Sequence, residues 1–484
     1  MQYDVVVVGG GIGGLTVASL LAARGISICL LERNSKVGGC VSRVEYSGHD
    51  FEPGMGLYPD WGPGEVHERI FAELPVDAPE TRVIEDDYVV RIPRSTDVYL
   101  RKDQTRFADE LRDAFPECAE QAISFYELVD KVSAGTQTQS SGAVAKTLRN
   151  LWPLSAGKDQ ISRAQSTIAL EYLTQTSERF RQFIDAQLRA FIQTPIERCA
   201  FLPACHALSL PRQRLYSIAG GPAAVAERLA EAIKKAGGTV LLNSPALRLA
   251  YSNSGDVVGV DLLSGETVIA NRAIVSNMTI WDTYGKLIGL NRTLPEVKKK
   301  LAAQISSGVY MIYASMEQSA KSRLPAERFL VSLDNSTDDV SPFEISFAMA
   351  GLPEQPAPEG KAAVTLKTST RVNDWFAFQS SEEDYEEWDQ SALERVWTRL
   401  HEALPELGGD IEVLETANPR TFYDETRRKL GMVLGVERTP ESLSAFDHRT
   451  TLPNVFMVGD TASKGSTLAA VSSSAHLLAK TLSE

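Results

Sequence analysis

Three glycines and one acidic residue near the N-terminus have the spacing of a nucleotide-binding site. Gly9, Gly11 and Gly14 fit the pattern G-x-G-x-x-G after an apolar run, and a second apolar run, residues 26–31, ends at Glu32. In this pattern the glycines let the backbone turn tightly and approach a pyrophosphate, while the acid binds ribose hydroxyls. The following helix would direct its unpaired N–H groups and the positive end of its dipole at the phosphates. The spacing therefore predicts a dinucleotide site, because a turn without a ligand would leave the three glycines unexplained.

The composition limits the class of protein. The chain has 484 residues, of which 43% are hydrophobic and 23% charged, and this is enough for two or three domains. Its net charge of −14 argues against nucleic acid as a partner, because phosphate binding needs a basic surface. The same charge argues against electrostatic attachment to anionic lipid, but it leaves contact through an apolar patch open.

The cysteines and the N-terminal residues indicate the compartment. The five cysteines are odd in number and form no C-x-x-C pair, so we expect a reducing, cytoplasmic environment without a disulfide framework. Cys199, Cys205 and His206 lack a fourth ligand at zinc spacing, so no metal site is expected. The first strand begins by Val5, where no signal peptide fits, and the glycines among residues 5–23 argue against a membrane-spanning helix.

Features typical of nucleotide binding occur at both ends of the chain and in its middle. Gly220-Gly221 opens an apolar helix, and the apolar strand 455–458 ends at Gly459-Asp460. The pattern predicts an α/β fold in which one domain is assembled from segments distant in sequence. The expected boundaries are 1–82, 211–290 and 440–484 for the nucleotide domain, 83–102 and 291–439 for a domain with an antiparallel sheet, and 103–210 for a helical lid. Strands of that second sheet are expected at 305–315, 343–350 and 362–369.

The residues after Glu32 make the interpretation more specific. Gly38-Gly39-Cys40 comes first, followed by Phe51-Glu52-Pro53-Gly54-Met55-Gly56. Together with the distal Gly459-Asp460, this order resembles the FAD-binding signature of the amine oxidase and phytoene desaturase superfamily. Residues 418–436 are similar to the block before the C-terminus of carotenoid desaturases, isomerases and retinol saturases. Among these, the chain most resembles CrtD-type carotenoid desaturases.

The resemblance implies non-covalent FAD in a Rossmann-type (GR2-like) domain, with an inserted α+β substrate domain and a helical lid. It implies a set of cofactor-binding residues: Gly9, Gly11, Ile12, Gly13, Gly14, Glu32, Arg33, Gly39, Cys40, Arg43, Gly54, Met55, Gly56, Ala246, Gly459, Asp460, Thr467 and Leu468. Cys40 stands where many amine oxidases have arginine, so the contact of that arginine with the pyrophosphate is absent or moves to Arg43. The segment Gly431 to Val436 and Asp460 are expected to share one site.

The activity implied by the resemblance is desaturation of a hydrophobic, carotenoid-like polyene by hydride transfer to flavin N5. The implied partners are that small molecule, a quinone or oxygen as electron acceptor, and the inner face of a membrane, contacted peripherally through residues 103–210. No catalytic residue stands out, because His206 is more simply interpreted as a structural histidine than as an acid–base group. The alternatives are an isomerase or saturase of the same fold, a flavin amine oxidase, and a lipid carrier without redox chemistry.

Overall fold

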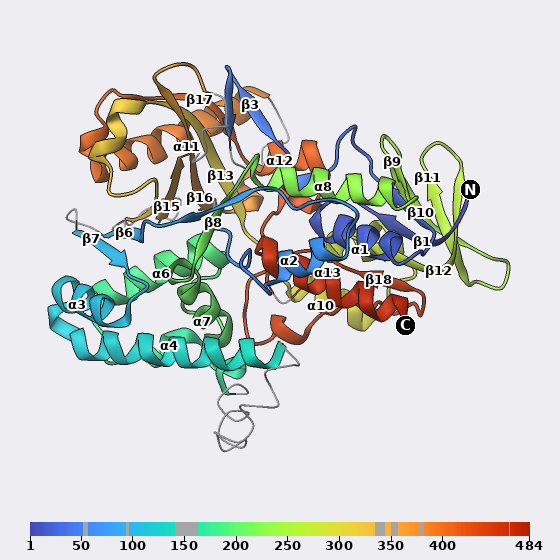
Figure 1. Ribbon diagram of the computed structural model, residues 1–484, viewed down its shortest axis with the longest axis horizontal. Coiled ribbons are helices and arrows are strands. Elements are labelled where there is room, and N and C mark those ends of the chain that lie inside the picture. Colours follow the sequence, from blue (N-terminus) through green and yellow to red (C-terminus); the bar gives the residue numbers. More distant parts are fainter. Residues whose placement is uncertain are drawn as a thin grey trace.

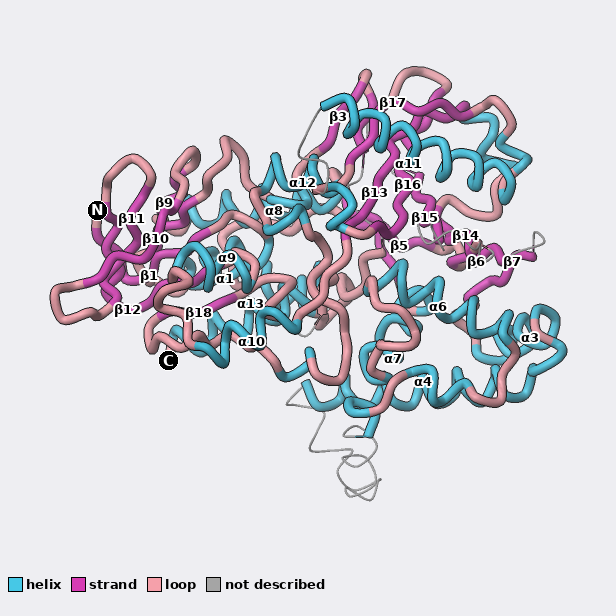
Figure 2. Tube along the Cα trace, turned by 180° about the vertical axis from the view of Figure 1, so that it is seen from behind, coloured by secondary structure: helices cyan, strands magenta, loops and turns pink. Residues whose placement is uncertain are grey.

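Two seven-stranded sheets organise the chain (Figure 1). The structure is a computed structural model that describes residues 1–51, 57–92, 96–140, 163–333, 344–349, 357–376, 382–463 and 465–484. Strands of the first sheet lie beside the N-terminus, and those of the second lie toward the other end of the molecule (Figure 2). Each sheet combines segments that are distant in sequence, as the motif positions suggested. The domain boundaries expected from the sequence stay a prediction.

The first sheet has a parallel core extended by an antiparallel meander. Its order is β10-β11-β12-β1-β2-β9, with β18 beside β12. The strands are β1 (Gln2–Val8), β2 (Ile28–Leu31), β9 (Thr239–Leu241), β10 (Ala246–Tyr251), β11 (Val257–Leu262), β12 (Thr267–Ser276) and β18 (Val455–Met457). β12 is one continuous strand: its first half pairs with β11 and its second half with β18, while β1 lies alongside both.

Three helices pack on this sheet around one apolar core. Helix α1 (Ile12–Ala23) is buried over all but its last residue and packs between α8 (Gly221–Lys235) and α13 (Leu468–Ser483). A helix that is apolar on every side has to be covered by neighbours on every side. The glycine turn at its N-terminus is therefore held rigidly at the carboxyl edge of the parallel strands.

The second sheet is antiparallel apart from one parallel pair, β14 with β6. Its order is β17-β13-β16-β15-β14-β6-β7. The strands are β17 (Ile411–Ala417), β13 (Gly308–Glu317), β16 (Lys361–Thr370), β15 (Glu344–Met349), β14 (Arg328–Ser332), β6 (Tyr88–Ile92) and β7 (Thr96–Leu100). Helix α11 (Glu382–Ala403) packs on the face of β13 that carries Tyr310 and Ile312, whereas Val309 and Met311 belong to the opposite face and a different core.

The remaining helices cover the second sheet and join the two halves. Helices α3 (Gln104–Ala114), α4 (Ala119–Ser140), α6 (Glu178–Ile192) and α7 (Phe201–Ser209) share a core with β6 and β7. The other elements are α2 (Val66–Ala72), α9 (Ile280–Asp282), α10 (Pro295–Ala303), α12 (Pro419–Thr426), β3 (Val44–Tyr46), β4 (His49–Phe51), β5 (Thr81–Ile84) and β8 (Leu215–Ile218). None of the described helices has the length and hydropathy needed to cross a bilayer.

Candidate functional site

A cavity of about 610 Å³ extends from the glycine turn of the first sheet to strands β13 and β16 of the second. This volume falls in the range of ligand pockets, roughly 300–1,000 Å³. Its nucleotide wall, defined here by Gly9 to Gly13, Glu32 and Gly459-Asp460, belongs to the first sheet. Its second wall, defined by Phe191, Val309, Met311, Lys367 and Phe422, belongs to the second sheet and its helices.

The glycine turn brings bare backbone to the cavity. Gly9 has a φ of +102°, a conformation that favours glycine. A Cβ on Gly14 would lie 2.3 Å from the carbonyl oxygen of Gly9, so this glycine lets helix and strand pack closely and does not itself line the cavity. A Cβ on Gly11 would lie 2.6 Å from the Asn277 amide nitrogen. Helix α1 has no side-chain cap, so the first N–H groups of the helix remain available at the cavity.

Glu32 lies at the end of β2 with its carboxylate in the nucleotide wall. It is 7% exposed, and its two oxygens accept hydrogen bonds from the backbone N–H of Gly10, at 2.7 Å, and of Asn34, at 2.8 Å. Each carboxylate oxygen can accept more than one hydrogen bond, so capacity for hydroxyl donors remains. Arg33 and Ala246 line the cavity beside it.

The C-terminal segment closes the nucleotide wall. Asp460 follows β18, and its Oδ2 accepts a hydrogen bond from Arg428 Nη2 at 2.7 Å. Although burial favours the neutral form of the guanidinium, Asp460 and its other acidic neighbours raise the pKa of Arg428, which is therefore charged. Thr467 caps α13 by accepting a hydrogen bond from Ala470 N, and Leu468 follows it in the cavity lining.

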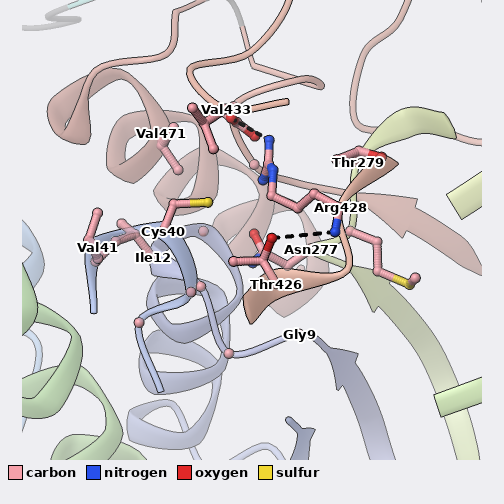
Figure 3. A pocket seen from close by; sticks show the side chains of 18 of the residues that line it. Gly9, Ile12, Cys40, Val41, Asn277, Thr279, Thr426, Arg428, Val433 and Val471 are labelled. Carbon is pink, nitrogen blue, oxygen red and sulfur yellow. Dashed lines mark hydrogen bonds and ion pairs between the residues drawn. The ribbon is translucent and has the colours of Figure 1, made fainter. Parts of the chain in front are cut away.

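The cation beside Cys40 is Arg428, not Arg43. Cys40 and Arg428 both line the cavity (Figure 3). Burial raises the pKa of the Cys40 thiol, which keeps this thiol neutral. Arg43, in contrast, is absent from the lining residues because its Nε donates to Asp50 Oδ2 at 2.8 Å. The Asp50 carboxylate is buried in β4 and holds the guanidinium there. Arg43 therefore does not line the cavity, and whether the arginine contact is absent or moves to Arg43 stays a prediction.

The structure brings most of the predicted residues together and separates a few. Gly9, Gly11, Ile12, Gly13, Glu32, Arg33, Gly39, Cys40, Ala246, Gly459, Asp460, Thr467 and Leu468 all line the cavity. Val433 and Leu434 line it too, so the segment Gly431 to Val436 reaches the same cavity as Asp460. Gly431 itself does not, and a Cβ there would lie 1.7 Å from the carbonyl oxygen of Pro419. Gly54, Met55 and Gly56 lie outside the described residues.

Sequence reasoning missed the residues that come from elements without a motif. Asn277 follows β12, and a Cβ placed on Gly9, Gly11, Gly13 or Gly14 would contact its side chain. Lys367 is opposite Met311 in the register of β16 and β13, and both line the cavity. The one sequence signal for this position was a lysine within the otherwise uncharged stretch 362–370 of a central strand. His206 is exposed and does not line the cavity. Within the described part of the chain, no group of three or more potential metal ligands occurs.

Comparisons with known proteins agree with this geometry. The family model described as flavin containing amine oxidoreductase matches residues 12–473. The chain is similar to prolycopene isomerase of Daucus carota, with 25% identity over 99% of this chain and 79% of the relative. It is also similar to all-trans-retinol 13,14-reductase of Danio rerio, with 23% identity over 95% of this chain and 82% of the relative.

The solved structures show the same fold. Cyclohexylamine oxidase from Brevibacterium oxydans has a TM-score of 0.62 and 18% identity, and the match covers each chain completely. The predicted α/β fold with a Rossmann-type nucleotide domain is confirmed, as are the predictions of an enzyme and of FAD as its cofactor. The carotenoid-type resemblance is confirmed by relatives named prolycopene isomerase. The chain belongs to the family of flavin-containing amine oxidoreductases.

Proposed function

We propose that the nucleotide wall binds FAD through its backbone and two carboxylates. The pyrophosphate would lie at the N-terminus of α1, beside Gly11 and Gly13, where a side chain would leave no room. Glu32 would accept hydrogen bonds from the adenosine ribose, and Ala246 would face the adenine. Asp460, Thr467 and Leu468 would contact the ribityl chain at the N-terminus of α13. Gly54, Met55 and Gly56 are retained in the proposed set from the resemblance alone.

We further propose that the enzyme is an oxidoreductase of hydrophobic polyenes. Bound FAD would supply a hydride acceptor at flavin N5. In desaturation an allylic C–H bond breaks with loss of hydride, a proton leaves the neighbouring carbon, and the remaining electron pair forms the new double bond. Phe191, Val309, Met311 and Phe422 would hold the chain of the substrate and keep water away from the reacting carbons. We assign no proton acceptor.

The observation that carries this proposal is the character of the second wall. It is apolar apart from Lys367, whose side chain is 5% exposed. Amine oxidase chemistry is the less suitable alternative, because a cationic amine would be repelled by a second cation in a site of low dielectric. The relatives named for prolycopene and retinol act on polyenes, which an apolar wall suits.

Isomerisation or saturation with reduced flavin is the second candidate, and the names of the two relatives favour it. The reactions differ in the hydrogen count of the product: a desaturase removes two hydrogens, an isomerase removes none and a saturase adds two. Purified enzyme should be incubated anaerobically with a polyene, once oxidised and once reduced, and the product analysed by mass spectrometry and flavin absorbance. Turnover of amines but not of polyenes would contradict the proposal.

Peripheral contact with a membrane, with a quinone or oxygen as electron acceptor, completes the proposal. A polyene of this kind is poorly soluble in water, so it would be taken from lipid. However, the described part of residues 103–210 carries no exposed large apolar side chain. Three such side chains, Leu290, Leu294 and Ile305, lie near α10 instead. Flotation with neutral liposomes at low and high salt tests the contact, which should be insensitive to salt. Absence of flotation at both salt concentrations would count against it.

A further inference from the structure

Lys367 is a buried cation in the second wall of the cavity. The register pairs it with Met311, so the two side chains and that of Val309 share one face of the sheet. Its Nζ donates a hydrogen bond to the carbonyl oxygen of Ala190 at 2.7 Å. An ammonium group has three N–H donors, and this contact uses one of them.

The contact with Ala190 has a structural role, but it does not account for the position of Lys367. Ala190 lies in the last turn of α6, where carbonyl groups lack helical partners and a lysine is a favourable cap. An apolar residue in β16 would complete the wall without placing an ammonium in it. Burial opposes the charged form and lowers the pKa of Lys367 to about 8. A hydrogen-bond donor buried in an apolar cavity is costly unless it meets an acceptor. The position of Lys367 therefore suits a ligand that carries an acceptor atom.

The charges around Lys367 indicate which acceptor fits. Glu344 on β15 is 1% exposed; its Oε1 accepts a hydrogen bond from Ser369 Oγ at 2.6 Å, and its Oε2 has no hydrogen-bond partner among the described residues. Arg189 on α6 is paired with Asp185 at 2.6 Å. Burial raises the pKa of Glu344, whereas Ser369, Arg189 and Lys367 act in the opposite direction and favour its carboxylate form. With Glu344 ionised, the two cations and the two carboxylates balance one another, so an anionic ligand would add an uncompensated buried charge. An uncharged oxygen would add none.

We infer that Lys367 anchors an uncharged oxygen, a hydroxyl or a carbonyl, at one end of the hydrophobic substrate. The ammonium donates a hydrogen bond to this oxygen, while Phe191, Val309 and Met311 contact the apolar remainder. The inference rests on the proposed function and narrows its substrate class to polyenes with an oxygenated end. An anchor at one end also fixes the direction of the polyene and thereby the carbon that is placed at the flavin.

The test compares matched probes with the FAD-loaded enzyme. All-trans-retinol, the hydrocarbon that lacks its oxygen, and the corresponding acid are titrated at pH 7 by quenching of tryptophan fluorescence. We expect the alcohol to bind more tightly than the hydrocarbon, and the acid to bind no more tightly than the alcohol. Lys367→Met should weaken the alcohol roughly ten- to a hundredfold, the loss expected for a hydrogen bond to a charged donor, and leave the hydrocarbon unchanged.

Two further variants keep the result interpretable. Lys367→Gln keeps a donor for Ala190 and for the ligand, so it should fold where Lys367→Met does not and keep part of the preference for the alcohol. Lys361→Met, at the half-exposed start of the same strand, removes a lysine that pairs with Glu317 and should change no affinity. Equal affinities for the alcohol and the hydrocarbon, or much tighter binding of the acid, would overturn the inference and leave the proposed function standing. Failure of all three probes to bind would instead contradict the proposed function.

Discussion

The two walls of the cavity differ in the atoms that they present to a ligand. The nucleotide wall is largely backbone: a turn of glycines, the N-terminus of α1 and the segment Gly459-Asp460. The second wall is side chains, contributed by β13, β16, α6 and α12. A backbone wall requires the absence of side chains at fixed spacing, which a sequence displays openly. A side-chain wall depends on which strands become neighbours and in which register, which no short motif encodes.

The largest expected effect is at Gly14, directly behind the nucleotide wall, where the close packing of α1 on β1 leaves no room for a side chain. In Gly14→Val the Cβ would lie 2.3 Å from the Gly9 carbonyl oxygen and would push α1 away from β1. We expect insoluble protein or a folded chain without flavin, measured as the ratio of bound FAD to protein. Gly285→Ala is the control, because a Cβ there has no neighbour within 4 Å. A fully loaded and active Gly14→Val enzyme would show that the cofactor lies elsewhere.

Lys367 in the second wall should make the stability of the protein depend on pH in the alkaline range. The backbone groups of the nucleotide wall do not titrate there. Burial lowers the pKa of Lys367 from 10.5 to about 8, so the unfolded chain binds more protons than the folded chain between these values. The wild type should therefore gain stability as pH rises through this window, by up to about 3 kcal/mol, relative to Lys367→Met. Urea unfolding of both proteins at both ends of the window measures the difference. Stability curves that run parallel with pH would contradict this account of Lys367.

Glu32 is the side chain of the nucleotide wall that is proposed to bind the adenosine ribose of FAD. Glu32→Ala removes the acceptor for the backbone N–H groups of Gly10 and Asn34 as well as for the ribose. We expect FAD affinity to fall by about 1.5–3 kcal/mol, the usual loss for a hydrogen bond to a charged group. Titration of apoprotein with FAD gives the affinity, and Glu227→Ala, an exposed residue of α8, is the matched control. An unchanged affinity would remove Glu32 from the site.

The fold and the first wall could be predicted because each rests on local patterns. The apolar strand, glycine turn and helix are contiguous, and strands of the second sheet were expected close to their observed limits. The sequence did not indicate β14 and β17, because β14 is short and β17 has a half-exposed, charged pattern at the sheet edge. Lys367 acquires its surroundings only through pairing with β13 and packing against α6, which are contacts between distant segments. Arg428 reaches the cavity in the same way, through its pairing with the distant Asp460.

The smallest effect is expected at Arg43, and it distinguishes proximity in sequence from proximity in space. Arg43 is three residues from Cys40 but pairs with Asp50 outside the cavity, whereas Arg428 lines the cavity and pairs with Asp460. Arg43→Ala should therefore change FAD affinity by less than about 0.5 kcal/mol, as for residues remote from a site, although it lowers the melting temperature by leaving Asp50 unpaired. Arg428→Met should weaken FAD clearly, because Asp460 would lose its counter-charge beside the proposed ribityl site. If Arg43→Ala released FAD as readily as Arg428→Met, Arg43 would contact FAD although it does not line the cavity. The FAD site would then extend beyond the nucleotide wall as defined here.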